Sequence, residues 1–182
     1  MRRRSVAAGA GRQCAPAALV GAIARPLNFT VSRRCRRSTM IQVLGSIELI
    51  RQKPQMYFAG AVTASAICSY LVDDALRLGA SHVRADSVER WSIVSADVDW
   101  LRLPEDRVIS IDRLFVGMHA HPSRINGIRS EVFVGAFAET AYVASPGEFS
   151  AVVGNAPLPE TISRVLCPPP CIRSVAFVVR DG

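Results

Sequence analysis

The sequence is poor in lysine throughout and has no acidic residue near its start. Lys53 is the only lysine among 182 residues, and residues 1–39 hold nine arginines without one aspartate or glutamate. Residues 40–182 contain the other 13 basic residues and all 15 acidic ones, a net charge of −2 against +7 for the whole chain. The later residues form no basic stripe with interleaved aromatics, so the sequence does not support nucleic-acid binding by that part.

Three interpretations fit residues 1–39, which are rich in arginine and free of acid. Arg2–Arg4 followed by the apolar stretch 15–24 resembles a secretory signal, whereas the arginine-rich, acid-poor composition is typical of an organellar transit peptide. In the third interpretation Met1 is not the true start, and the protein begins at Met40. The 49% hydrophobic content of the whole chain excludes a largely disordered protein. We therefore leave 1–39 out of the fold and treat 40–182 as a single domain.

Cysteine is also scarce. Cys14 and Cys35 belong to the first 39 residues, and the three remaining cysteines are too few for a disulfide framework. This count predicts a reducing compartment and hence a cytoplasmic location. Cys68 lies in an apolar helical pattern and is expected to be a core thiol. Two ligands cannot close a zinc site, so Cys167 and Cys171 are interpreted as thiols that flank a proline-rich turn.

Several chemical signatures are missing. The sequence contains no G-x-x-x-x-G-K-[ST], no C-x-x-C, no H-E-x-x-H and no G-x-S-x-G. His119 and His121 have too few neighbouring ligands for a metal site and are interpreted as an inert loop pair. Residues 54–72 carry no charge over a length that could cross a bilayer, but Pro54, Gly60 and several polar residues interrupt them. We predict a loop followed by a helix there, and no membrane segment.

Hydrophobic spacing predicts an α+β domain. Helices are expected over 41–52, from Thr63 or Ser65 to Leu78 with an end at Gly79, and from Ser130 as N-cap to about 144. Alternation and β-branched residues predict strands over 81–85, 91–96, 149–153 and 174–179, while 107–116 is ambiguous. This order predicts a two-layer sandwich with helices on one face of a mainly antiparallel sheet.

One segment carries a family signature. Residues 48–60, Glu-Leu-Ile-Arg-Gln-Lys-Pro-Gln-Met-Tyr-Phe-Ala-Gly, match most fixed positions of E-x-[VI]-R-x-[RK]-P-x-M-Y-x-x-G. This pattern resembles the start of the ATPase domain in the ATP-hydrolysing subunits of DNA gyrase and its relative topoisomerase IV, which belong to the GHKL superfamily together with histidine kinases. The resemblance implies a Bergerat-like α+β sandwich, with ATP and magnesium as cofactors if the site survives.

In that family the next helix carries E-x-x-D-N, whose Glu is the general base for water and whose Asn holds magnesium. Tyr70 and Asp74 occupy the two positions here, on one helix face. A phenol with a pKa of about 10 is a poor general base at neutral pH, whereas Asp74 offers a hard oxygen ligand for a cation. The helix considered alone favours a simpler interpretation, in which Tyr70 covers the core and Asp74 is solvated.

The resemblance next implies an adenine-binding Asp in D-x-G-x-G after a strand. Asp97 occupies that position after the strand predicted at 91–96, although an acidic turn is an equally good interpretation. Both glycines are replaced, by Asp99 and Leu101. These side chains obstruct a nucleotide and remove the conformational freedom of glycine.

The last family motif is G-x-x-G-x-G, which leads into a helix whose N-terminus holds phosphates. Gly127 is retained, Ser130 and Val132 replace the other two glycines, and Glu131 places negative charge where phosphates would lie. Because Lys53 is the only lysine, no later lysine is available for a γ-phosphate. The resemblance therefore implies candidate nucleotide contacts at Asp97, Gly127 and Ser130 and a candidate metal ligand at Asp74, without a catalytic base.

These departures predict a shortened, degenerate GHKL-type domain that is not a competent ATPase and acts in binding or regulation, through a protein partner or as a homodimer. The first alternative is a divergent but working ATP-binding domain, with Asp97 on adenine and Asp74 on a cation. The second is an unrelated small α+β interaction module.

Overall fold

The computed structural model describes residues 45–102 and 109–180. The predictions for 1–39 lie outside these residues, as do the first part of the helix expected over 41–52 and the start of the ambiguous segment 107–116. Residues Ile41–Gly182 form one compact unit. No helix within 45–102 or 109–180 is both long enough and apolar enough to cross a membrane.

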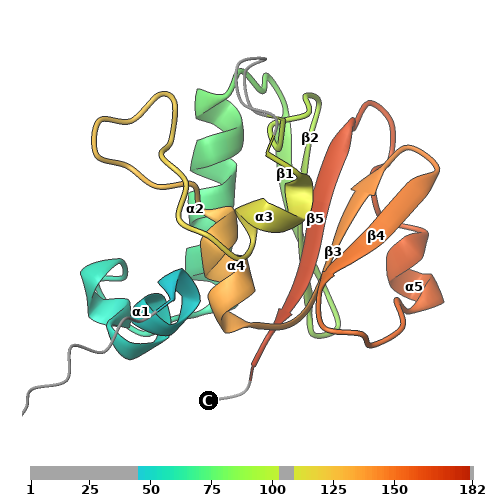
Figure 1. Ribbon diagram of the computed structural model, residues 1–182. Helices are drawn as coiled ribbons and strands as arrows, with labels where there is room; N and C mark the ends of the chain where they lie inside the picture. Colours follow the sequence, from blue (N-terminus) through green and yellow to red (C-terminus); the bar gives the residue numbers. More distant parts are fainter. Residues whose placement is uncertain (1–44, 103–108, 181–182) are drawn as a thin grey trace, which may run out of the picture. The chain divides into compact units, whose positions relative to one another are not determined.

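The centre of this unit is a five-stranded antiparallel sheet (Figure 1). Its strands are β1 Val83–Val88, β2 Trp91–Ala96, β3 Ala138–Ser145, β4 Glu148–Val153 and β5 Arg173–Val179. The spatial order is β1-β2-β5-β3-β4, so the last strand of the chain lies between β2 and β3. The α+β class predicted from the sequence is confirmed.

The central strand β5 is buried on both faces, because its alternating side chains enter two different hydrophobic clusters. Val175 and Phe177 join the main core, whereas Ala176 and Val178 join a smaller cluster on the other face. A strand that is covered on both sides reads as a continuous apolar run, as residues 175–179 of β5 do.

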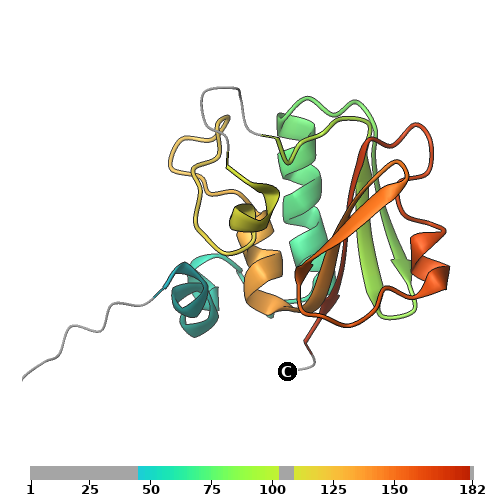
Figure 2. The same ribbon diagram turned by 45° about the vertical axis from the view of Figure 1, so that its right-hand side comes forward.

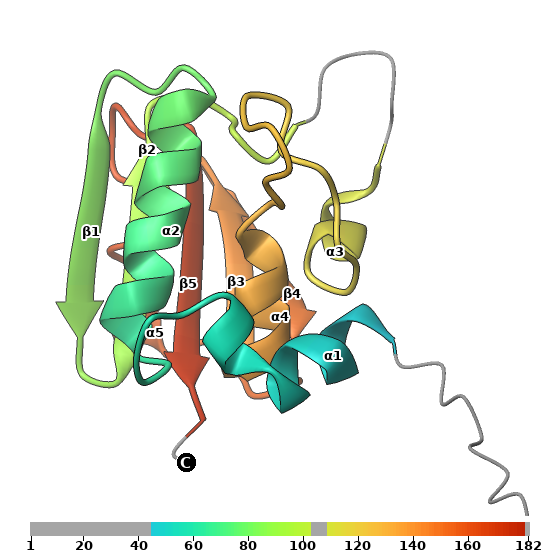
Figure 3. The same ribbon diagram turned by 90° about the vertical axis from the view of Figure 1, so that its left-hand side faces the viewer.

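The main core lies between the sheet and four helices on one side of it (Figures 2 and 3). These are α1 Ser46–Gln52, α2 Ala64–Arg77, α3 Ile111–Leu114 and α4 Glu131–Phe137, with a short 3₁₀ turn at Pro54–Met56.

A fifth helix, α5 Glu160–Ser163, differs from the prediction that the helices lie on one face. It covers the opposite face, where Ile162 packs in one cluster with Trp91 and Tyr142. The cause is the smaller cluster, which offers apolar side chains on that face for a short helix to cover.

Helix α2 forms as its sequence predicts. The Thr63 side chain accepts a hydrogen bond from the Ala66 nitrogen at 3.1 Å, which caps the N-terminus. Ile67 and Leu71 of the predicted stripe are fully buried against the sheet. Gly79 follows the C-terminus with φ +99°, a left-handed conformation that glycine adopts without strain.

The helix predicted from Ser130 to about 144 is wrong in its second half. Helix α4 ends at Phe137, and Ala138 already has an extended backbone that begins β3. Pairing with β4 on one side and β5 on the other determines this structure, and local spacing of apolar residues does not reveal such partners.

Gly135 allows α4 to lie against the end of α3. A Cβ at this position would collide with the Phe115 carbonyl oxygen, a backbone atom that cannot rotate away. Arg51 of α1 holds the same end of α4, since its Nε donates to the Ala136 carbonyl at 2.6 Å. The signature segment at 48–60 thus begins with a contact that fixes α4.

Candidate functional site

Asp74 and Ser130, which the resemblance assigned to the metal and the phosphates, are in direct contact. Both are fully buried, and Asp74 Oδ2 accepts a hydrogen bond from the Ser130 backbone nitrogen at 2.8 Å. The expectation that Asp74 is solvated is therefore wrong. Ser130 does occupy the N-cap position, but its hydroxyl makes no capping bond. A carboxylate on α2 satisfies the first turn of α4 in its place.

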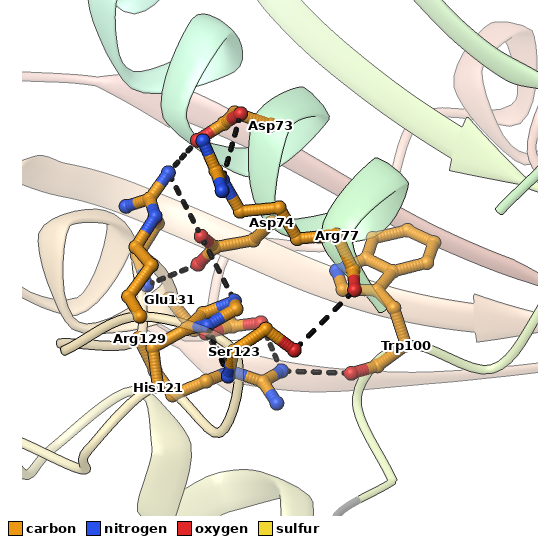
Figure 4. A network of polar contacts seen from close by, with 10 residues as sticks. Asp73, Asp74, Arg77, Trp100, His121, Ser123, Arg129 and Glu131 are labelled. Carbon is orange, nitrogen blue, oxygen red and sulfur yellow. Dashed lines mark hydrogen bonds and ion pairs between the residues drawn. The ribbon is translucent and has the colours of Figure 1, made fainter. Parts of the chain in front are cut away.

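His121 is the second partner of Asp74 (Figure 4). Its Nδ1 accepts a hydrogen bond from the Ser123 backbone nitrogen at 3.1 Å, so the proton of the neutral ring belongs on Nε2. That nitrogen lies 3.3 Å from Asp74 Oδ1. The loop histidine that the sequence presented as inert is thus a buried partner of a carboxylate.

Burial affects the two members of this pair in opposite directions. It raises the pKa of the Asp74 carboxyl, while the hydrogen bond from the Ser130 backbone nitrogen acts against the shift. It lowers the pKa of the His121 ring, while the nearby Asp74 charge acts against that shift. Arg124 adds a positive charge at the rim, with Nη2 3.5 Å from Asp74 Oδ1 and an ion pair to Asp73.

A second buried pair lies beside the first. Arg129 and Glu131 are both fully buried, with Nη2 2.5 Å from Oε1 and Nε 3.1 Å from Oε2. The same Nη2 donates to the Trp100 carbonyl at 2.8 Å. Such a bidentate arrangement is the geometry that offsets the desolvation of both charges most effectively.

We refer to Asp74, His121, Arg129, Ser130 and Glu131 as the buried polar network. The atoms that make it unusual are buried side-chain nitrogens and oxygens without a hydrogen bond, which native cores rarely contain. Within 45–102 and 109–180 all of them lie in this network or in the adjoining tryptophan: Asp74 Oδ1, Trp100 Nε1, His121 Nε2, Arg129 Nη1 and Ser130 Oγ.

The surroundings of Asp74 do not fit a magnesium ion. Both of its oxygens face nitrogen donors, from Ser130 on one side and from His121 and Arg124 on the other. A divalent cation requires several oxygen ligands and would be repelled by the guanidinium group. In the part of the chain that the structure describes, no three His, Cys, Asp or Glu residues are grouped so as to hold a metal ion.

Tyr70, at the position of the family's general base, points into an aromatic cluster. Its hydroxyl donates to the Tyr57 carbonyl at 2.6 Å, and its ring packs against Phe58 and Phe133. Tyr70 and Asp74 both face α4, so they share one face of α2 as their spacing predicts. A hydroxyl committed as a donor to a backbone oxygen is not placed to accept a proton from water.

Asp97 and Gly127 have separate roles. Asp97 Oδ1 accepts a hydrogen bond from the Ser81 nitrogen at 3.0 Å, and hydrogen bonding with the His82 and Ser81 backbone holds the pKa of this carboxyl below its usual value. The Gly127 carbonyl accepts from the His121 nitrogen at 2.9 Å, which helps to fix the loop that carries this histidine.

Asp99, which replaces the first glycine of the D-x-G-x-G motif, makes a bidentate ion pair. Arg173 donates to it through Nε at 2.8 Å and through Nη2 at 2.6 Å. This contact joins the turn after β2 to the start of β5. Asp99 is therefore a structural link between these two segments.

A pocket of 570 Å³ lies outside the buried polar network. It is bounded by α2, the β1–β2 hairpin and the loop before β5, and it is lined by Val72, Leu76, Val83, Asp97, Pro168–Pro170 and Cys171, among others. Its volume is typical of sites that take small molecules. Asp97 is the only predicted site residue in its lining.

Sequence reasoning did not single out Arg129, interpreted His121 as inert and considered Glu131 only as a negative charge where phosphates would lie. The available signal was the pair of opposite charges on either side of Ser130, Arg129 and Glu131. Two opposite charges this close in the chain, at the start of a helix, can be buried together as an ion pair. Comparisons with family models, curated proteins and solved structures found no match for this chain. Its function is therefore inferred from its own residues.

Proposed function

We propose that this chain is a degenerate GHKL-type domain that does not hydrolyse ATP and acts by binding or regulation, through a protein partner or as a homodimer. The observation that carries the proposal is the hydrogen bond from the Ser130 nitrogen to Asp74 Oδ2 at 2.8 Å. It joins two positions between which the family holds magnesium and phosphates.

Electrostatics support the loss of nucleotide binding. A phosphate at the start of α4 would have to displace Asp74 from Ser130 and would then lie near Glu131, a second buried carboxylate. Like charges repel strongly in a site shielded from water. Arg129 does not compensate, because Glu131 and the Trp100 carbonyl already engage its guanidinium.

The order of elements supports the family assignment. The signature segment precedes a helix with Tyr70 and Asp74. A strand pair comes next, with Asp97 directly after it, and the loop from Gly127 into α4 follows. The signature itself has a structural use that does not depend on ATP. Tyr57 and Phe58 pack against Phe133 of α4, which explains why the segment remains when the nucleotide chemistry is absent.

Calorimetric titration of the full chain with ATP, with and without magnesium, tests the proposal. We expect no binding in either condition. Micromolar binding that is lost in Asp97→Ala would support the alternative of a working ATP-binding domain and would overturn the proposal. The matched control is Asp86→Ala on β1, because Asp86 is half-buried, pairs with Arg84 and takes part in none of the proposed nucleotide contacts.

Sedimentation of the full chain over a range of concentrations tests the mode of action. A concentration-dependent dimer would support action as a homodimer, whereas a monomer at all concentrations would favour a different protein as partner. An experimental structure with helices and strands in another order would leave the third interpretation, an unrelated α+β interaction module.

A further inference from the structure

Two thiols meet at the start of β5. The Sγ atoms of Cys167 and Cys171 lie 2.8 Å apart, and both side chains are more than nine-tenths buried. Both residues are free cysteines. The Ser174 hydroxyl holds them together, because it accepts from the Cys167 nitrogen at 3.1 Å and contacts Cys171 Sγ at 3.2 Å.

The chain between the thiols is stiff and fixed at both ends. Its three residues, 168–170, are all prolines, whose rings restrict φ and reduce the entropy lost on ordering the turn. The Cys171 nitrogen donates to the Pro168 carbonyl at 2.8 Å, and the Ile172 nitrogen donates to the Ala96 carbonyl of β2 at 2.8 Å. The two sulfurs are therefore held near each other by the fold.

The backbone at Cys167 is strained. Its φ of +50° lies in the left-handed region, which costs a residue other than glycine about 1–3 kcal/mol. Such strain persists where the surrounding structure enforces it, and it is frequent at functional positions. Here it directs the Cys167 side chain toward Cys171, within a small movement of the disulfide bond length of about 2.0 Å.

The two thiols differ in access. Cys171 lines the 570 Å³ pocket, and Cys167 is not among its lining residues. Arg84 and Asp97 place one positive and one negative charge on the same lining. A small peptide disulfide that carries carboxylate and ammonium groups matches this pair of charges and would reach Cys171 first.

We propose that Cys167 and Cys171 form a redox-active dithiol, a modification site that a low-molecular-weight disulfide such as oxidised glutathione enters through the pocket. The Cys171 thiolate attacks one sulfur of glutathione disulfide, which forms a mixed disulfide and releases one glutathione thiolate. Cys167 then attacks the Cys171 sulfur and releases the second. Two electrons pass to glutathione disulfide, and the two thiol protons end on the two glutathione molecules.

The order of attack follows from the surroundings of Cys167. Burial, a hydrogen bond with Cys171 and the nearby Cys171 charge raise the pKa of Cys167 to about 12, so this thiol is protonated and a poor first nucleophile. Two of these three causes come from Cys171 and end when Cys171 enters a mixed disulfide. Cys167 is therefore suited to the second step, which is intramolecular.

Tryptic mapping of the full chain provides a direct test. Both cysteines lie in one peptide, Val165–Arg173, because the nearest arginines are Arg164 and Arg173. The reduced, folded protein is incubated with oxidised glutathione, quenched with an alkylating reagent under denaturing conditions and digested. We expect this peptide to lose two hydrogen atoms and to escape alkylation, whereas the peptide with Cys68 is alkylated.

Two single variants test the roles. Cys167→Ser is expected to accumulate glutathione on Cys171, because the resolving thiol is absent. Cys171→Ser is expected to react at least about 10-fold more slowly, because Cys167 does not face the pocket. Circular dichroism verifies that both variants fold.

Three outcomes would overturn the proposal. In the first, both thiols of the folded wild-type protein remain open to alkylation after incubation. In the second, a glutathione adduct persists without an intramolecular bond. In the third, the two serine variants react at equal rates. None of these readouts depends on ATP or on the GHKL assignment, so the dithiol and the proposed function can fail separately.

Discussion

Arg129 and Glu131 lie two residues apart in the chain and form a fully buried, bidentate ion pair, with Nη2 2.5 Å from Oε1. The pair sits where α4 begins, beside the hydrogen bond from Ser130 to Asp74. Two opposite charges and a carboxylate from α2 thus occupy the region in which a nucleotide-binding relative would keep space and positive potential. The network therefore explains the packing of α4, and it supports the proposal that the chain does not hydrolyse ATP.

Breaking the Arg129–Glu131 pair should strongly destabilise the fold. Glu131→Gln leaves the Arg129 guanidinium buried without its counter-charge, and removal of one partner of a buried pair costs about 3–5 kcal/mol. Urea unfolding of the variant measures the loss. Removal of both charges in Arg129→Met with Glu131→Leu should recover part of it, because no unpaired charge then remains.

The control for this experiment is Glu160→Gln, which breaks the exposed pair with Arg164 on α5. Exposed pairs contribute little because solvent screens them. Equal losses in Glu131→Gln and Glu160→Gln would contradict the buried arrangement.

Asp74 can be tested with two substitutions of different chemistry. Asp74→Ala removes the acceptor of the Ser130 N–H and should cost about 1–3 kcal/mol, because a buried donor is left unpaired. Asp74→Asn keeps an acceptor and should cost less.

The pH dependence separates charge from capping at Asp74. Burial raises the pKa of Asp74 above its value in the unfolded chain. This carboxyl therefore contributes its full stabilisation below the unfolded pKa, and the contribution is lost as pH rises through the folded pKa. The free energy of unfolding of Asp74→Asn, taken relative to wild type, should therefore be higher at about pH 7 than at about pH 4. Urea unfolding at the two pH values measures this, and a constant difference would contradict the raised pKa.

His121 should remain neutral in the folded protein. Because the pKa of His121 is lowered in the fold, the ring of the unfolded chain is protonated first as pH decreases. The contribution of this residue to stability is therefore fully present above about pH 6.5 and falls as pH decreases below that value. Nitrogen NMR should show the proton on Nε2 and a bare Nδ1 that accepts from Ser123. A ring protonated on Nδ1 at neutral pH would show that the assigned contacts are incorrect.

Gly135 should not tolerate a methyl group. Gly135→Ala would push a Cβ into the Phe115 carbonyl, and such overpacking typically costs about 1–3 kcal/mol. Gly60→Ala is the matched control, since a Cβ there meets nothing within 4 Å. Thermal unfolding compares the two, and equal midpoints would mean that α3 and α4 approach less closely than described.

The sequence specified local structure well where local signals agree. Thr63, the stripe at Ile67 and Leu71, and Gly79 all predict α2, and each has its expected role. It failed for Ala138–Ser145, where local spacing suits a helix and only the pairing with β5 determines a strand.

The candidate site was predictable in position more than in chemistry. The resemblance selected Asp74 and Ser130, which are in contact. It did not reveal that they bind each other, or that Arg129 and Glu131 are buried, since a sequence shows charges without showing which of them lose water. That depends on the path of the loop from His121 into α4, a property of the tertiary structure.

The positive charge of residues 1–39 leads to the last prediction. If the full chain binds DNA, the binding should depend on the nine arginines of this segment, because residues 40–182 carry a net charge of −2. Binding to phosphates releases counterions and weakens steeply with salt. Fluorescence anisotropy with a labelled duplex at two salt concentrations, on the full chain and on residues 40–182, tests this. Salt-sensitive binding retained by 40–182 would show that the scattered basic residues of the folded part form a DNA-binding surface after all.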